Sequence, residues 1–275
     1  MTADWTAQAR ALIERGEPAA LVTLTDVKGS APREAGARML IWADGQRDTI
    51  GGGNLEYEIA RQARAMLADG GDGFERDYPL GPILGQCCGG LVRVRCERLS
   101  RADSARLAAA ARDERGRKAA VLIFGAGHVG AALARALAPL PFMVHTYDPR
   151  PEYAEVATAY DHPARIVAGA EVGAFYIVLT HNHDLDYELV RAVLSRRDGA
   201  YCGLIGSRSK RARFERQLRA DGLAGDLRRL TCPIGGSIGL KGKAPAVIAA
   251  ATAAEMMLVL ESQQANAVTE AAHAE

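Results

Sequence analysis

The sequence predicts an α/β protein in which a C-terminal domain with a parallel sheet follows a smaller α+β domain. Short apolar segments alternate with glycine clusters over the first hundred residues, which is typical of a small α+β unit. An alanine-, arginine- and acid-rich segment follows, and from residue 119 onward strand, glycine turn and helix repeat in that order. We therefore expect one domain over residues 1–100, a linker helix over 101–118, a second domain over 119–262 and a fraying tail over 263–275.

The composition shows no strong electrostatic preference. The 275 residues include 34 basic and 33 acidic side chains, for a formal net charge of +1. We expect neither nucleic acid nor an anionic membrane surface to attract such a chain. No uninterrupted apolar run approaches the roughly 20 residues of a membrane helix, and the first residues lack the pattern of a signal peptide. A cytoplasmic location with five reduced cysteines is the expectation.

Residue patterns locate the elements of the first domain. A helix at Asp4–Arg15 has an apolar stripe. A second helix, at Asn54–Ala68, is expected to be capped by Asn54 and terminated by Gly70. Four strands are predicted at Ala19–Thr25, Arg38–Trp42, Phe74–Tyr78 and Leu91–Glu97.

The second domain has the pattern of a parallel sheet covered by helices on both faces. A last helix at Pro245–Leu260 is apolar nearly all round, so we expect it to be buried, with a second subunit as one candidate for covering it. Strands are predicted at Val121–Phe124, Met143–Tyr147, Arg165–Val167, Phe175–Thr180 and Ala200–Ile205.

A glycine motif follows the first of these strands. Gly125, Gly127 and Gly130 form a G-x-G-x-x-G pattern that leads into an alanine-rich helix. Gly125 allows a tight turn, Gly127 lets the backbone approach a phosphate, and Gly130 lets the helix pack closely on the strand. The motif predicts a Rossmann fold with a phosphate-binding loop, although any phosphorylated ligand of suitable shape would fit such a loop.

Two side chains near this loop are candidates for ligand contact. Asp148 ends the next strand, where a carboxylate would bind a ribose diol, and Arg150 would tolerate a 2′-phosphate, so the choice between NAD and NADP stays open. A solvated loop carboxylate is the alternative for Asp148. His128 lies inside the loop and either reaches a ligand or caps the helix, and we favour the cap.

Two further loops are expected at the carboxyl edge of the parallel sheet, where ligands of such sheets bind. His181 and His183 flank Asn182 after the fourth predicted strand, so the loop would contact a ligand or hold a divalent metal, while Asn182 is also an ordinary helix cap. Ser207 and Arg208 begin a basic helix after the fifth strand. They would form a second phosphate or carboxylate cradle, or simply a solvated helix face.

Glycines also mark the first domain. Gly51, Gly52 and Gly53 lead directly into a helix, and a long polar loop spans residues 28–38 with Arg33 and Arg38. Three consecutive glycines indicate a sharp bend or a close approach of the backbone. Anion binding and a tight structural turn explain this pattern equally well.

The most unusual segment contains two adjacent cysteines between glycines. Gln86, Cys87 and Cys88 stand in the sequence Leu-Gly-Gln-Cys-Cys-Gly-Gly. Adjacent thiols rarely form a disulfide with each other, because their Cα atoms are only about 3.8 Å apart. They would bind a soft metal, carry sulfur or respond to oxidation, with burial as packing residues as the alternative. Cys96 and Cys202 are expected to be structural, and Cys232 is undecided.

Six segments together carry a resemblance to a known family. They are Gly29–Arg33, Gly51–Glu56, Gly85–Gly90, Gly125–Gly130, Thr180–Asp186 and Cys232–Gly235. In order and spacing they resemble the XdhC/CoxI family of xanthine dehydrogenase accessory proteins, over nearly the whole chain. The resemblance implies a cytoplasmic homodimer, not an enzyme, that binds the molybdenum cofactor transiently. It would protect the cofactor during sulfuration, engage a cysteine desulfurase and deliver the cofactor to apo-xanthine dehydrogenase.

The resemblance also implies roles for particular residues. Cys87 and Cys88 would be the thiol element that approaches the metal, with Gln86 beside them. The glycines of the Rossmann motif would be the nucleotide-type loop. Two other functions stay open from the residues alone: an NAD(P)-dependent oxidoreductase whose Thr180–Asp184 loop supplies an acid or base, and a non-catalytic nucleotide sensor.

Overall fold

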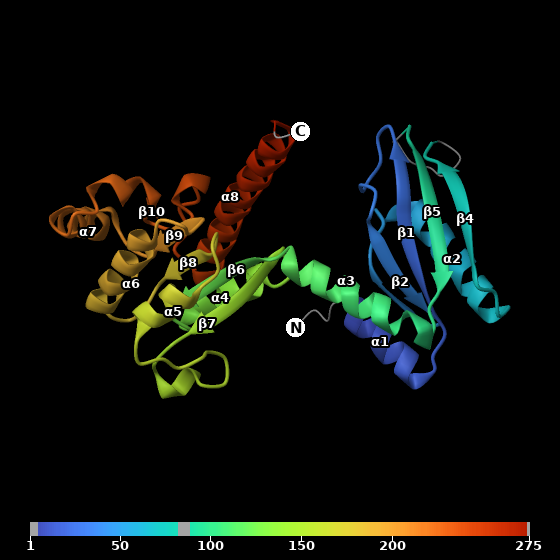
Figure 1. The fold of residues 1–275 in the computed structure, drawn as a ribbon, viewed down its shortest axis with the longest axis horizontal. Helices are drawn as coiled ribbons and strands as arrows, with labels where there is room; N and C mark the ends of the chain where they lie inside the picture. Colours follow the sequence, from blue (N-terminus) through green and yellow to red (C-terminus); the bar gives the residue numbers. More distant parts are fainter. Residues whose placement is uncertain (1–4, 82–88, 274–275) are drawn as a thin grey trace. The chain divides into compact units, whose positions relative to one another are not determined.

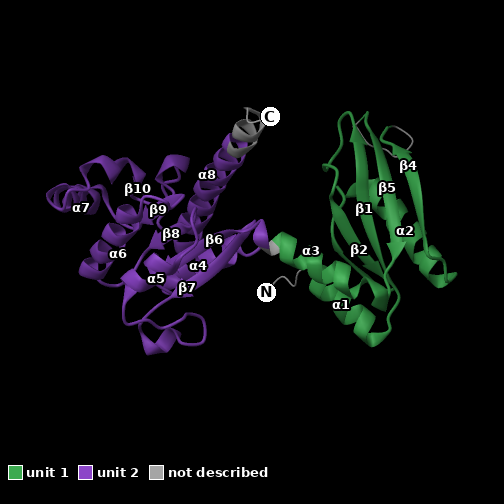
Figure 2. Cartoon of the chain, in the orientation of Figure 1, with its two compact units in different colours: residues 1–114 green, residues 115–275 purple. Residues whose placement is uncertain are grey.

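A computed structural model describes residues 5–81 and 89–273, and the side chains of all of these except 115 and 267–273. The chain divides into two compact units, residues 1–114 and 115–275 (Figure 2). The division falls within helix α3 (Ser104–Gly116), in the segment for which the sequence predicts a linker helix. Each unit has its own sheet and its own core, and each is described separately below.

Unit 1 is built on an antiparallel sheet with the strand order β3-β2-β1-β5-β4 (Figure 1). All four predicted strands are present, and the structure adds β3. The short, polar sequence of β3 gave no strand signal, and it pairs as the second arm of a hairpin with β2. The strands are β1 (Ala19–Lys28), β2 (Arg38–Trp42), β3 (Gly45–Asp48), β4 (Gly73–Pro79) and β5 (Leu91–Arg98).

Helices cover both faces of this sheet. Helix α2 (Gly53–Ala68) packs Leu55 and Ile59 into the core of one face, where Cys96 is buried as predicted. Helices α1 (Trp5–Arg15) and α3 pack Leu12 and Leu107 on the other face. Helix α3 is therefore only partly solvent-exposed, because its apolar side chains help to close the second core of unit 1.

Unit 2 is built on a parallel sheet with the order β10-β9-β8-β6-β7, which confirms the predicted α/β fold. The strands β6 and β8 are neighbours although β7 lies between them in sequence, so successive strands are added on opposite sides of β6 and the strand order reverses there. Ligands of open parallel sheets bind at such a reversal, outside the carboxyl ends of the strands. The strands are β6 (Ala119–Phe124), β7 (Phe142–Tyr147), β8 (Phe175–Val178), β9 (Tyr201–Leu204) and β10 (Leu230–Thr231).

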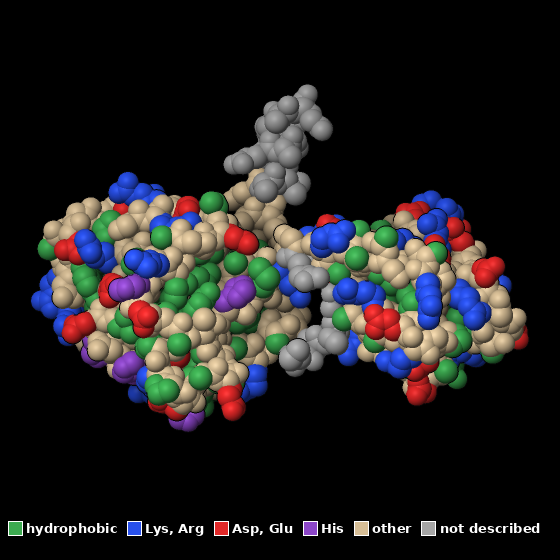
Figure 3. Space-filling view, turned by 60° about the horizontal axis from the view of Figure 1, so that its bottom comes forward, with side chains coloured by type: hydrophobic (Ala, Val, Ile, Leu, Met, Phe, Trp, Pro, Cys, Tyr) green, Lys and Arg blue, Asp and Glu red, His purple; other side chains and the backbone are tan. Residues whose placement is uncertain are grey.

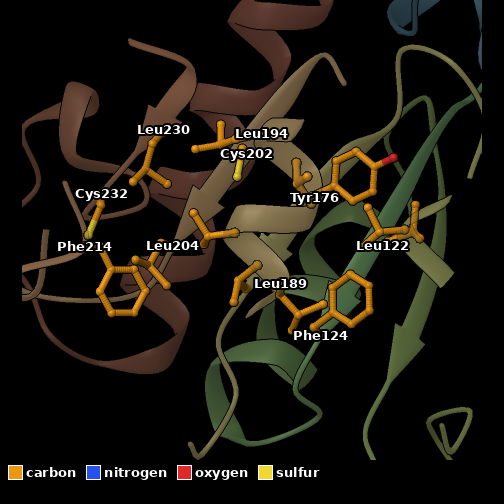
Figure 4. Close-up of a cluster of buried hydrophobic side chains, with 14 of the residues drawn as sticks. Leu122, Phe124, Tyr176, Leu189, Leu194, Cys202, Leu204, Phe214, Leu230 and Cys232 are labelled. Atoms are coloured by element: carbon orange, nitrogen blue, oxygen red, sulfur yellow. The ribbon is translucent and has the colours of Figure 1, made fainter. Parts of the chain in front are cut away.

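Helices lie on both faces of the parallel sheet. The first face carries α4 (His128–Leu137) and α8 (Pro245–His273), which pack against each other. The other face carries α5 (Pro163–Gly169), α6 (His183–Arg196) and α7 (Arg208–Ala220), whose apolar side chains meet those of the strands in the cluster shown in Figure 4.

The structure of unit 2 differs from the prediction in three places. Residues 165–167 lie in helix α5, because Pro163 starts a helix at this point and Val167 packs into the core from it. Strand β10 has only two residues and gave no signal. The expected tail does not begin at residue 263, because α8 continues without interruption to His273.

Helix α8 is long and apolar enough over Pro245–Asn266 to cross a membrane, judged by length and composition. No other described helix passes this test. One side of α8 is buried, since Ala249, Ala253, Met256 and Leu260 belong to the core between α8 and the sheet. A core helix of a globular domain has the same composition, so this helix is weak evidence for a membrane. On the face drawn in Figure 3, basic and acidic side chains are interspersed, as the small net charge predicts.

Candidate functional site

The glycine loop after β6 has the backbone geometry that its sequence predicts. Gly125 has φ 121°, a conformation that favours glycine. A Cβ atom at Gly125 would collide with the carbonyl group of Leu179, and one at Gly130 would collide with the carbonyl oxygen of Gly125. The tight turn and the close helix–strand contact are therefore confirmed as the reasons for these two glycines.

Gly127 differs from the other two glycines because it faces open space. Its φ is −62°, and a Cβ atom built on it would meet nothing within 4 Å. It is the N-cap residue of α4, with no side-chain cap hydrogen bond and no acidic residue in the first turn. The exposed His128 is the first residue of the helix, so its predicted role as a cap is wrong. The N-terminus of α4 thus presents backbone N–H groups and a partial positive charge to this edge.

Asp148 lies beside this loop but is held by the protein itself. Its carboxylate accepts hydrogen bonds from the N–H of Ala126 at 2.8 Å and from the Arg150 guanidinium at 2.8 and 2.9 Å. The residue is 2% exposed, so the alternative of a solvated loop carboxylate is wrong. Burial alone would raise the pKa of Asp148, but the bonds from Arg150 and Ala126 outweigh it and lower the pKa to about 2.

The pairing with Arg150 limits what Asp148 can bind. Arg150 also lies over the ring of Tyr153, at 4.4 Å from its centroid. A ribose diol would have to displace this bidentate arginine to reach the carboxylate. Whether Asp148 contacts a ligand stays a prediction, and the structure adds that such contact requires Arg150 to move.

The loop after β8 is organised by Asn182 and Asp186. Asn182 caps α6, since its side chain accepts from the N–H groups of Asp184 and Leu185, as one interpretation of the sequence predicts. Asp186 is fully buried and accepts from the N–H and the hydroxyl of Thr180 at 3.0 and 2.7 Å. His181 and His183 are exposed. The described residues contain no group of three His, Cys, Asp or Glu side chains that could hold a metal, so a three-ligand metal site in this loop is not supported.

Lys210 connects this loop to the next one. Its Nζ donates to Asp186 at 2.6 Å and to the carbonyl of Ile205 at 3.0 Å. Arg211 is also engaged, with Glu215 at 2.8 Å and with the Leu230 carbonyl at 3.0 Å. Two basic residues of α7 that follow Ser207 and Arg208 therefore stabilise the domain.

Arg208 keeps the chemistry that the cradle requires. It lines an open hollow of about 660 Å³ together with Arg211 and Arg228. Among the residues that the structure describes, Arg208 and Arg228 contact no acidic side chain. The hydroxyl of Ser207 accepts from the N–H of Lys210 and caps α7. The hollow therefore offers two unpaired guanidinium groups, with Arg228 as a member that the sequence did not indicate.

The glycine run of unit 1 is a structural turn. The carboxylate of Glu56, in the first turn of α2, accepts from the N–H groups of Ile50 at 3.2 Å and Gly52 at 3.0 Å. It also accepts from the hydroxyl of Thr49. The N-cap of α2 is Gly52, so the predicted cap at Asn54 is wrong. Because Glu56 already supplies an anion to this loop, the alternative of binding an external anion loses its support.

Other motifs of unit 1 gather around this turn. A Cβ atom at Gly51 would collide with Pro32, and one at Gly90 would collide with the carbonyl oxygens of Lys28 and Ser30. The polar loop, the glycine run and the residues that follow the double-cysteine segment therefore meet at one end of the sheet. Arg38 does not join them, because it lies by Trp5 on the other face.

The cysteines separate into two groups. Gln86, Cys87 and Cys88 lie outside the described residues, so their predicted roles stay predictions. Cys202 and Cys232 are buried in the apolar cluster of Figure 4. Burial raises the pKa of the Cys202 thiol to about 12 and also raises that of Cys232. Cys202 is structural as predicted, and the structure assigns the undecided Cys232 to the same group.

Sequence reasoning missed Glu255. It is 6% exposed, and its carboxylate accepts from the Tyr201 hydroxyl, the N–H of Gly235 at 2.8 Å and the N–H of Ser237 at 3.1 Å. Glu255 therefore fixes the Gly235–Ser237 turn to α8. Its signal was present, because Glu255 is the one charged side chain in the apolar stretch Pro245–Leu260, and a carboxylate buried there must find partners.

Comparisons with known proteins find similarity over nearly the whole chain. The chain is 28% identical over 290 residues to the uncharacterized protein YqeB of Escherichia coli (strain K12), covering 97% of this chain and 48% of YqeB. The chain thus spans about half the length of this curated relative. A crystal structure of a Bacillus halodurans protein described as a xanthine dehydrogenase has a TM-score of 0.76 at 19% identity, over 94% of this chain and 96% of that one. This likeness shows a shared fold.

Family models match both units. The model described as the XdhC Rossmann domain matches residues 121–256, which include the glycine loop and most of unit 2. The model described as the XdhC and CoxI family matches residues 12–78, which include the glycine run of unit 1. The two matches together cover most of the chain, in the same order as the two sheets, and the chain therefore belongs to the XdhC and CoxI family.

Proposed function

We propose that this protein is an accessory protein of xanthine dehydrogenase maturation. It binds the molybdenum cofactor as cargo, protects it during sulfuration and inserts it into apo-xanthine dehydrogenase. In this proposal it acts in the cytoplasm as a homodimer, not as an enzyme, and receives sulfur through a cysteine desulfurase. Family membership supports a role linked to xanthine dehydrogenase, and the chemistry of unit 2 supports binding of a phosphorylated cargo.

The observation that carries the proposal is the open N-terminus of α4. The cargo carries a phosphate group, and a helix N-terminus with unpaired N–H groups favours such an anion. Gly127 leaves room for the backbone to approach it, since a Cβ there would meet nothing within 4 Å. The arginine hollow at Arg208 is a second candidate for the phosphate, with two unpaired guanidinium groups.

The thiols of Cys87 and Cys88 would supply the ligands for the molybdenum end of the cargo. Thiolates are soft ligands and suit a soft, sulfur-bearing metal centre. The three described cysteines are buried, with the thiol pKa values of Cys96 and Cys202 raised by burial to about 12. Metal or sulfur chemistry by cysteine in this chain therefore falls to the Cys87–Cys88 pair.

The NAD(P)-dependent oxidoreductase is disfavoured by the state of Asp148. The carboxylate that would bind the ribose diol is paired with Arg150 and with the N–H of Ala126. Turnover with a nicotinamide, or a nicotinamide found in the isolated protein, would restore that alternative.

The test uses anoxic full-length protein mixed with free molybdenum cofactor, followed by ultrafiltration and measurement of retained molybdenum and pterin. We expect wild-type protein to retain the cofactor. Gly127→Asp and the double variant Cys87→Ala/Cys88→Ala should each retain at least about tenfold less, through charge repulsion and loss of the soft ligands respectively. Gly169→Asp is the matched control, since a Cβ atom there would also meet nothing within 4 Å, and Gly169 ends α5 before β8 begins, away from the carboxyl edge of the sheet.

Three outcomes would each contradict a part of the proposal. Wild-type protein that retains no molybdenum would remove the cargo itself. A double cysteine variant that retains as much molybdenum as wild type would remove the thiol role, while an unchanged Gly127→Asp variant would remove the glycine loop as the phosphate site.

A further inference from the structure

We infer that a cavity at the carboxyl end of β9 binds the ring of a phosphorylated heteroaromatic ligand. The cavity has a volume of about 420 Å³ and lies between the loop after β9, the loop that begins at Pro233 and the first turns of α8. This volume falls in the range of about 300–1,000 Å³ that is typical of small-molecule sites. The inference deepens the proposed function, on which the choice of a pterin as the first probe rests.

The walls of the cavity are apolar and come from several segments of unit 2. Ile205 and Pro233 line it from the two loops, and Val247 and Ile248 line it from α8. Leu240 also lines the cavity and is 55% exposed, which is high for a leucine. A flat ring placed between these side chains would cover Leu240 and bury apolar surface on both of its faces.

The rim of the cavity carries positive charge. Lys241 and Lys243 line it and are exposed, and within the described part of the chain neither ammonium group contacts an acidic side chain. Two uncompensated cations at the mouth of an apolar cavity favour a ligand that joins an apolar ring to an anionic group. We therefore assign an anionic group of the ligand to the rim, which makes the rim a third candidate for the phosphate beside the N-terminus of α4 and the hollow at Arg208.

The loop that forms one wall is fixed before any ligand arrives. Glu255 holds this loop through the N–H groups of Gly235 and Ser237. Gly235 also packs so closely on α8 that a Cβ atom there would lie 2.7 Å from the Cβ of Ala251. A wall that is already ordered costs little conformational entropy on binding, which favours a specific site over an accidental gap.

The cavity lies at the same edge of the sheet as the glycine loop. It is lined by residues that follow the carboxyl end of β9, as the glycine loop follows that of β6. Helices α4 and α8 pack against each other, and Val129 of α4 and Ile248 of α8 join the same apolar cluster. The cavity therefore belongs to the edge at which ligands of open parallel sheets bind.

The experiment titrates full-length protein with 6-hydroxymethylpterin monophosphate and, separately, with NADH, and follows the fluorescence of each ring. Inorganic phosphate serves as the probe that lacks a ring. We expect Leu240→Asp and Lys241→Ala/Lys243→Ala each to weaken binding of the ring probe by about tenfold or more, because they repel or no longer attract the phosphate. The pterin and the nicotinamide arms identify which ring the cavity accepts.

Matched variants separate the cavity from general effects. Leu258→Asp changes another exposed leucine, at 59% exposure, that does not line the cavity. Arg213→Ala/Arg216→Ala removes two exposed positive charges from α7 outside the cavity. We expect both controls to bind the ring probe as wild type does.

Binding of either ring probe with this pattern of variants supports the inference. The inference would be overturned if neither ring probe binds. It would also be overturned if inorganic phosphate alone competes fully with the ring probes, or if the control variants lose as much affinity for the ring probe as the cavity variants do. The outcome is separable from the proposed function. A protein that binds the pterin probe in the cavity but retains no molybdenum contradicts only the cargo. A protein that retains molybdenum equally in the cavity variants contradicts only the cavity.

Discussion

Two loops of this protein are both rich in glycine, but they differ in whether a carboxylate of the chain accepts from their backbone N–H groups. Gly51–Gly53 precedes α2 in unit 1, and Gly125–Gly130 precedes α4 in unit 2. In the first loop, Glu56 from the helix itself accepts from two backbone N–H groups. In the second loop, Asp148 accepts from one N–H group of the loop, that of Ala126, and the first turn of α4 has no acidic residue.

The difference teaches that glycines indicate the backbone geometry of a loop, whereas acidic side chains decide whether its N–H groups are available to a ligand. Glycines mark where the backbone turns sharply or passes close to another segment. Whether the N–H groups exposed by that turn can serve a ligand depends on whether the chain supplies its own carboxylate. In the loop before α2, the carboxylate of Glu56 already accepts from the N–H groups, whereas Gly127 and the first turn of α4 are open to an external anion.

The largest expected effect is a difference in the rate at which the cysteine thiols of the two units react with an alkylating reagent. Burial raises the pKa of Cys96 and of Cys202 to about 12, so their thiolate fraction at pH 8 is on the order of a thousandfold below that of a free cysteine. Native protein treated with iodoacetamide at pH 8 should be labelled at Cys87 and Cys88 and spared at Cys96, Cys202 and Cys232.

Peptide mass spectrometry reads this labelling, and protein labelled in denaturant provides the reference in which all five cysteines react. Rapid labelling of Cys202 in native protein would contradict the buried core of unit 2. Protection of both Cys87 and Cys88 would contradict the accessible thiol pair and, with it, the proposed metal contact.

The next largest effect separates two glycines of the same loop. Gly130→Ala should destabilise unit 2 by about 3 kcal/mol, because the new Cβ would overlap the carbonyl oxygen of Gly125. Gly127→Ala should change stability by less than about 0.5 kcal/mol, because nothing lies within 4 Å of the new atom.

Urea unfolding can assign the change to one unit. The two tryptophans, Trp5 and Trp42, both lie in unit 1, so their fluorescence follows that unit, while far-ultraviolet circular dichroism follows both. Gly130→Ala should shift the dichroism transition of unit 2 and leave the fluorescence transition in place. A shift of the fluorescence transition of equal size would contradict the division into two units.

A smaller effect is expected from the titration of Asp148. Its folded-state pKa of about 2 lies below the unfolded value near 3.9, so the pairing stabilises unit 2 above about pH 4 and this stability is lost as the pH falls toward 2. The contribution is about 2 kcal/mol. Unfolding followed by circular dichroism between pH 6 and pH 3 should show this dependence, and Asp148→Asn should reduce it.

The smallest effect is expected when the carboxylate of Glu56 in the glycine loop of unit 1 is replaced. Glu56→Gln should destabilise unit 1 by about 1–2 kcal/mol, because one carboxylate oxygen accepts both N–H groups and the other accepts from Gln46, whereas an amide offers a single oxygen. Glu58→Gln is the matched control, since Glu58 pairs on the surface of α2 with Arg61 and Gln62, where solvent screens the interaction, so its effect on the stability of unit 1 should be much smaller. Equal effects in tryptophan fluorescence unfolding would remove the special role of Glu56.

The elements that the sequence predicted well are those with a strong local pattern. Strand β6, its glycine loop and α4 follow from an apolar run, a G-x-G-x-x-G motif and an alanine-rich segment. Strands β3 and β10 were missed because they are short and are held by pairing with neighbouring strands. Residues 165–167 looked like a strand in isolation, and Pro163 together with packing of Val167 against the core makes them a helix.

By itself, the sequence determined the order of strands, glycine turns and helices and the edge at which the candidate loops gather, because periodicity and turn chemistry act between near neighbours. Only the tertiary structure decided which charged groups are free. Lys210 forms an ion pair with Asp186, and Glu255 accepts from the N–H of Gly235. Arg208 and Lys241, in contrast, have no acidic partner among the described residues. Such pairs join residues far apart in the chain, so they depend on packing that no local pattern encodes.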